Sequence, residues 1–192
     1  MHLTRWQYPG PVLIAALWFA ALALPVLADD DGRFEIRNAY VEFVGDRWQL
    51  DVRLDLGLSE AARQAFDEGV PLTLLLEVEA TKARRLLPDE TVVSLTREWQ
   101  LAYDALADRY VVNDPQSGER TSHASREEAL AALARISALT LADSSKLPPN
   151  RRFEMRVRAS IEIGDLPAAV KMLLFWKSWS RSTDWYVWSV RP

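Results

Sequence analysis

Side chains that could carry out hydrolysis are sparse in this sequence. His123 is the only histidine after the first few residues, and Ser122 is its neighbour along the chain rather than a partner brought to it by folding. The sequence has no Gly-x-Ser-x-Gly motif, which presents the serine nucleophile in many hydrolases. A zinc site at His123 would need carboxylates for its remaining protein ligands. We therefore expect no catalytic residue, no metal and no cofactor, and we interpret His123 as a loop residue just ahead of a helix.

Carboxylates are plentiful, and two pairs fall on shared strand faces: Asp51 with Asp55, and Glu77 with Glu79. A pair of carboxyl groups is what glycoside hydrolysis requires, at a separation that sequence does not give. Alternating acids are also typical of a solvated strand face that pairs with cations on the neighbouring strand. We favour such ion pairing, and the available partners are Arg53, Arg156 and Arg158.

Basic residues are concentrated in two stretches that a sheet could bring together. The set consists of Lys82, Arg84, Arg85, Arg151, Arg152, Arg156 and Arg158. A patch of this kind would suit an acidic partner surface or anionic lipid. The alternative is that these cations pair with acids on adjacent strands. We retain Arg84 and Arg85 as candidate interface residues.

The C-terminal end is rich in tryptophan, namely Trp176, Trp179, Trp185 and Trp188. These rings could fill the edge of the core, or several could stay exposed as an interface, a sugar-stacking platform or an anchor at a membrane surface. On a strand, Trp185 and Trp188 point to opposite faces because their positions differ by an odd number, three. Trp188 shares its face with Tyr186 and Val190, which favours Trp188 as the inward residue. The candidate contacts are therefore Trp176, Trp179 and Trp185.

The N-terminal residues have the pattern of a secretory signal peptide. Arg5 precedes an uncharged run from Pro11 to Leu27, and Val26-Leu27-Ala28 has small residues where a signal peptidase cleaves. An uncleaved anchor is the alternative, because the apolar run approaches the length of a membrane span. We expect cleavage after Ala28, so that residues 29–192 form a single periplasmic domain without obligate membrane insertion.

The net charge and the cysteine content exclude two further classes of function. The chain carries a formal net charge of −4, whereas nucleic-acid-binding domains present a basic surface. It has no cysteine, so disulfides and thiolate chemistry are both excluded.

A long alternating stretch, Phe153–Ile163, organises the rest of the chain. Its apolar and polar residues alternate without error, which predicts a strand with one buried and one wet face. Similar alternation predicts strands at Trp48–Leu58, Leu72–Lys82 and Leu95–Ala105. A further strand at Phe34–Phe43 changes parity near Asn38-Ala39, which indicates a β-bulge. A short strand at Tyr110–Val112 and a last strand at Trp185–Arg191 complete the set.

Helical patterns are fewer. Ser59 can cap a helix over Glu60–Glu68, and Ser125-Arg126-Glu127-Glu128 has capping-box spacing that predicts a helix to about Leu139. Residues 113–121 are predicted to form a loop, and residues 168–176 a third, short helix. We predict an α+β fold in which an antiparallel β-sheet of long amphipathic strands carries two or three covering helices. A β-sandwich with inserted helices is the alternative.

Several segments together resemble a known family. They are Gly69-Val70-Pro71-Leu72, the stretch from Trp99 to Leu106 with Tyr110-Val111-Val112, and the closing region from Leu166-Pro167 through the tryptophan-rich tail. The order of these segments resembles an exported bacterial family catalogued as domain of unknown function 4390. The resemblance implies an envelope protein with no established activity and no catalytic residues to transfer, encoded beside membrane-bound sensor kinases.

We therefore expect a non-enzymatic protein-interaction module whose partner is another envelope or membrane protein. The alternative is a binder of small ligands or glycans, or a weak hydrolase, that uses the C-terminal tryptophans.

Overall fold

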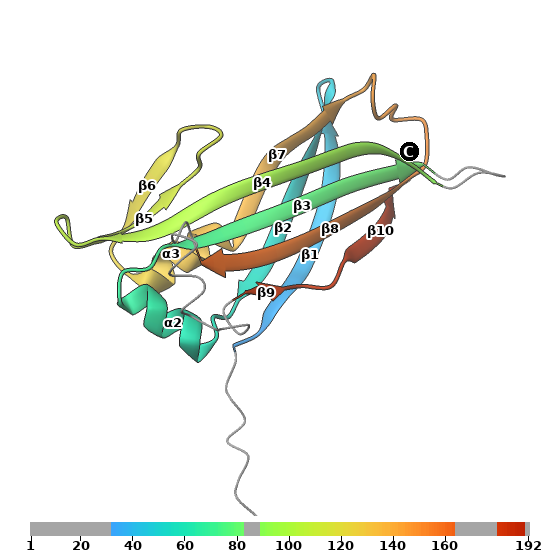
Figure 1. The fold of residues 1–192 in the computed structure, drawn as a ribbon. Coiled ribbons are helices and arrows are strands. Elements are labelled where there is room, and N and C mark those ends of the chain that lie inside the picture. The colour runs from blue at the N-terminus through green and yellow to red at the C-terminus, as the bar shows by residue number, and fades with distance from the viewer. Residues whose placement is uncertain (1–31, 83–88, 164–179, 191–192) are drawn as a thin grey trace, which may run out of the picture.

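The computed structural model describes residues 32–82, 89–163 and 180–190 (Figure 1). The predicted signal segment lies outside these residues. So do four of the five candidate interface residues, namely Arg84, Arg85, Trp176 and Trp179, and the helix predicted over residues 168–176. Trp185 is within the described part of the chain.

The described residues form two antiparallel sheets and two short helices. The larger, seven-stranded sheet contains, in spatial order, β10 (Tyr186–Val190), β8 (Phe153–Ile163), β3 (Leu72–Lys82), β4 (Glu90–Asp104), β5 (Arg109–Asn113) and β6 (Arg120–His123), while β9 (Arg181–Ser182) also pairs with β8. The smaller sheet has the order β1 (Phe34–Val44), β2 (Arg47–Leu56), β7 (Arg135–Asp143). The helices are α2 (Glu60–Asp67) and α3 (Arg126–Leu133).

The predicted α+β fold with long antiparallel strands is confirmed. The smaller sheet lies across the larger one, and one hydrophobic cluster joins them: Leu50 and Val52 of β2 pack with Leu76 of β3 and Val157 of β8 (Figure 1). The helices lie together at one end of the strands, where α3 packs on β5 and β6 and covers that end of the larger sheet (Figure 1). Two sheets therefore pack face to face, as in the β-sandwich that the sequence left as the alternative.

Alternation explains why β3 and β8 form the centre of the larger sheet. Leu74, Leu76 and Val78 of β3 are buried, and Val157 opposite Val78 is fully buried as well. Each strand buries every second side chain against the smaller sheet, which is the pattern that the sequence predicts. The β-bulge predicted in β1 is confirmed as a register shift between Ile36 and Asn38.

The helix predicted to run to about Leu139 is wrong in its second half. It ends at Leu133, and Arg135 begins β7, which pairs with β2. Ile136 and Leu139 have helical spacing, but pairing with β2 places their backbone in a sheet and buries the Ile136 side chain. A bulge in β7 accommodates the remaining mismatch, and Ala138 has the left-handed φ of 54° there.

The predicted loop over residues 113–121 is wrong at both ends. Asn113 closes β5, and Arg120 already opens β6. The turn between them is held by Asp114 and by Gly118 with its φ of +74°. The tetrapeptide of β6 lacks apolar alternation, so only its pairing with β5 makes it a strand.

Candidate functional site

A cleft of about 550 Å³ opens between the inner face of β4, β5 and β6 on one side and α3 and β7 on the other. It exists because the two sheets differ in width. The smaller sheet ends at β7, whereas β5 and β6 continue the larger sheet beyond it (Figure 1). Among the described residues, no strand of the smaller sheet therefore lies opposite the inner face of β5 and β6.

An ion pair lies in the wall of the cleft. Arg97 of β4 pairs with Leu76 of β3 and therefore points to the inner face, where the neighbouring strands carry core residues. Its Nη2 donates to Asp114 Oδ2 at 2.6 Å, and the two side chains are 21% and 12% exposed. The Nε of Arg97 is buried and has no acceptor among the described residues. A half-buried ion pair at a core-facing position is costly unless it has a role in structure or binding.

The loop after β5 fixes the Asp114 carboxylate. Its Oδ1 accepts the backbone N–H of Gln116 at 2.9 Å and of Ser117 at 3.2 Å. Burial raises the pKa of Asp114, but these hydrogen bonds and the charge of Arg97 outweigh it, so that the pKa lies below its ordinary value of 3.8. Asp114 is therefore a permanent anion near neutral pH.

The rest of the cleft wall is mixed. Trp99 lies beside Arg97, whose guanidinium carbon is 5.8 Å from the ring centroid. Val112 and Ile136 add buried apolar surface, while Arg135 and Ser137 are exposed at the β7 side. An aromatic ring, apolar side chains and a fixed charge pair suit binding.

Trp185, the predicted contact within the described residues, lies on the opposite, outer face of the larger sheet. Its ring centroid is 4.7 Å from the guanidinium carbon of Arg156 and 4.8 Å from that of Arg158. Arg158 Nε donates to Glu77 at 2.8 Å, and Arg156 pairs with Glu79. The glutamates are thus ion paired across β3 and β8 as predicted. Each arginine of this Trp185 cluster already has a carboxylate partner.

Trp188 occupies the face predicted for it. It pairs with Met155 of β8, packs partly buried against the core, and lies 5.7 Å from the Tyr186 ring. Neither Trp185 nor Trp188 contributes to the 550 Å³ cleft, which uses Trp99 instead.

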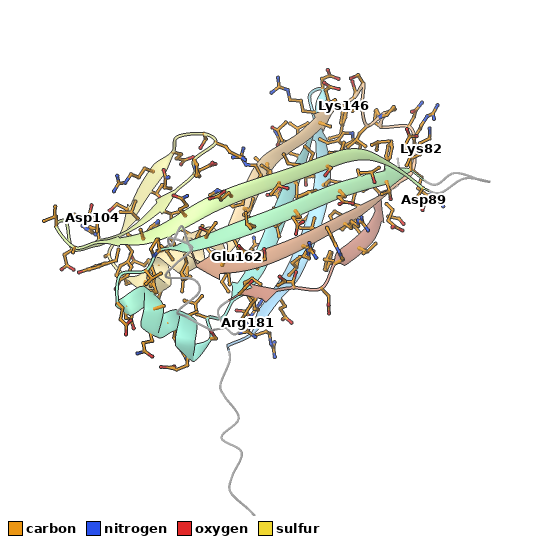
Figure 2. All side chains as sticks on the ribbon, in the orientation of Figure 1. Lys82, Asp89, Asp104, Lys146, Glu162 and Arg181 are labelled. Atoms are coloured by element: carbon orange, nitrogen blue, oxygen red, sulfur yellow. The ribbon has the colours of Figure 1, made fainter. Side chains whose placement is uncertain are left out.

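The basic residues do not gather into one patch within the described chain. Arg156 and Arg158 belong to the Trp185 cluster. Lys82, Arg151 and Arg152 instead line a separate hollow of about 470 Å³ that also includes Asp89 and Glu154. Figure 2 shows Lys82 and Asp89 at the end of the long strands opposite Asp104. Acids are interspersed here, so this hollow is not a simple anion site.

The prediction that His123 is a loop residue is wrong, because pairing with β5 makes it the last residue of β6. Its Nε2 is 3.2 Å from Oγ1 of Thr121, which belongs to the cleft lining. No cluster of His, Asp and Glu in the described ranges could hold a metal ion. No described helix has the length and apolar character needed to cross a membrane.

Comparison with known families decides the relationship. The family model for a domain of unknown function, DUF4390, matches residues 31–189. The chain belongs to this family. The match begins just after the predicted signal segment and covers β1 through nearly all of β10. No curated protein and no solved structure matches the chain.

Sequence reasoning missed the cleft residues of this DUF4390 domain, although one signal was available. Arg97 interrupts the apolar side of β4 between Leu95 and Trp99, at a position whose parity faces the core. A charge at such a position indicates a buried ion pair or a cavity. Its partner Asp114 lies in a turn whose place beside β4 depends on the β4–β5 hairpin.

Proposed function

We propose that this DUF4390 domain is a non-enzymatic protein-interaction module of the bacterial cell envelope, and that the cleft receives a segment of its partner. The observation that carries the proposal is the part of the inner face of β4–β6 that α3 leaves open beside β7, the outermost described strand of the smaller sheet. Apolar surface on a sheet face is usually packed against another element or against a partner, because its exposure to water is unfavourable.

The cleft favours a polypeptide over a small polar substrate. It follows β7 from Arg135 to Thr140, a run of about 16–20 Å for an extended strand. Its best-fixed charges, on Arg97 and Asp114, already neutralise each other. The rest of the lining combines apolar and aromatic surface with hydroxyl groups and with the charges of Arg135 and Glu119. Protein interfaces have this mixture of apolar and polar groups.

The envelope location rests on the N-terminal pattern, with cleavage after Ala28 and a periplasmic mature domain. The absence of cysteine and the net charge of −4 accord with an exported domain that has no nucleic-acid partner. The resemblance described above suggests the outer part of a membrane-bound sensor as the partner.

Binding of small ligands or glycans through the C-terminal tryptophans has less support. Trp185 has two guanidinium groups against its ring, and both are ion paired. A sugar would have to compete with these contacts.

Site-specific photo-crosslinking in cells tests the proposal. A benzophenone amino acid replaces Ser137, which is exposed in the cleft, or Ser94, which is exposed on the outer face of β4 and serves as the matched control. We expect a discrete adduct with one envelope protein from position 137 only, and the substitution Trp99→Ala should weaken it. No adduct from position 137, or the same adduct from both positions, would contradict the proposal.

A further inference from the structure

We infer that the partner segment binds as an added β-strand on β7 and becomes the fourth strand of the smaller sheet. This inference rests on the proposed function and specifies the form that the partner takes. It follows from the edge of β7, the larger sheet above it and the charges at the mouth of the cleft.

The edge of β7 provides the backbone groups. Within the described strands β7 pairs only with β2, so its other edge has N–H and C=O groups without a strand partner. That edge is part of the cleft, because Ser137, Ala138 and Leu139 line it. An extended segment placed there satisfies these groups by main-chain hydrogen bonds, which is how strand addition gains affinity. The β2–β7 ladder shifts register at two points, and the irregular edge that results limits the registers open to an added strand.

The larger sheet leaves room beside β7 for one added strand but not for a second complete sheet. β5 and β6 lie beyond β7 and flank the space that a fourth strand would fill (Figure 1). A second copy of the domain, bringing its own two layers to the β7 edge, would collide with this overhang. A lone strand fits, and its inward side chains would pack on Trp99 and Val112.

Charge specifies the segment further. Arg53 of β2 and Arg135 of β7 are directly opposite each other, and neither forms an ion pair within the described residues. Like charges at opposed positions repel. A carboxylate on the added strand beside Arg135 would relieve this repulsion. The predicted ligand is therefore an extended segment of alternating apolar and polar residues, with an acidic residue next to Arg135.

A random nonapeptide library, displayed on phage and selected on the mature domain, tests these features. Enriched peptides should alternate apolar and polar residues and carry Asp or Glu at one shared position. Arg135→Glu, at an exposed position, should select Lys or Arg there instead. A selected acidic peptide should bind the wild-type domain about fivefold more tightly than the Arg135→Glu variant. Failure to enrich, helical spacing, or an unchanged charge preference would overturn the inference.

Hydrogen exchange on the same complex identifies the binding mode. Bound peptide should slow exchange of β7 amides over residues 136–140, and N-methylation of alternate peptide residues should abolish both protection and binding. A peptide that depends on Trp99 but leaves the β7 amides unprotected would contradict strand addition while leaving cleft binding intact. Protection that appears without peptide in a concentration-dependent dimer would show that a second copy occupies the edge, and would also overturn the inference. Loss of the cleft-specific crosslink would count against the proposed function itself.

Discussion

Trp185 and Trp188 are close in sequence but differ in environment, so their replacement by alanine should have unequal effects. Trp188 packs against the core beside Met155, and its loss should lower the free energy of unfolding by about 2–4 kcal/mol. Trp185 is also partly buried, but it stacks on two arginines of the outer face and is not part of the core cluster, so its loss should cost about 1 kcal/mol. Urea unfolding measures both. Equal losses would mean that Trp185 is as much a core residue as Trp188.

Asp114 should make stability depend on pH in the acid range. Its pKa is lowered in the folded protein, so the stabilisation is fully present above the unfolded pKa of about 4 and is lost as pH falls through the lower folded pKa. Asp114→Asn removes this effect and leaves the half-buried Arg97 without its charge partner, which should cost about 1–3 kcal/mol at pH 7.

The measurement is the unfolding free energy of the wild type and of Asp114→Asn between about pH 2 and 7. The difference between the two should shrink towards acid pH. A constant difference would contradict the assignment of Asp114 as a carboxylate stabilised by its loop and by Arg97.

At the scale of elements, β7 shows how tertiary pairing overrides local preference. Its residues continue a helical pattern from α3, yet the free energy of completing a sheet with β2 decides the outcome. Pairing with β2 requires a bulge at Ala138, and this non-glycine residue has a φ of 54° there, which is an unfavourable backbone conformation for alanine.

Ala138→Gly should therefore stabilise the domain by about 0.5–1 kcal/mol, since glycine adopts this φ without a Cβ penalty. The matched control is Ala142→Gly in the same strand. Ala142 is buried and is not a positive-φ residue, so this change should destabilise by about 1 kcal/mol or more. Thermal unfolding of the two variants distinguishes the sites. A loss of stability in Ala138→Gly would mean that the bulge is unstrained.

At the scale of the whole molecule, the sequence predicts the parts whose pattern is set by one buried face. β2, β3 and β8 alternate because each packs one face on the shared core, and Glu77 and Glu79 find Arg158 and Arg156 because those strands are adjacent. β6 escaped prediction because its residues Arg120–His123 carry no apolar pattern. The cleft could not be predicted, because it depends on the smaller sheet ending at β7 while the larger sheet continues to β6. The sequence feature that indicated the cleft was Arg97, a charged residue at a core-facing position of β4.

The central claim is that the partner enters the cleft between the two sheets. Because the chain has no cysteine, Ser137→Cys in the cleft and Ser94→Cys on the outer face can each be labelled at a single thiol with a bulky polyethylene-glycol maleimide. The decisive measurement is the affinity of each labelled domain for the partner captured from position 137. The label at position 137 should abolish binding, the label at position 94 should leave it unchanged, and both unlabelled variants should bind like the wild type. If the partner binds with unchanged affinity to the domain that carries the polyethylene-glycol label at position 137, the claim is contradicted.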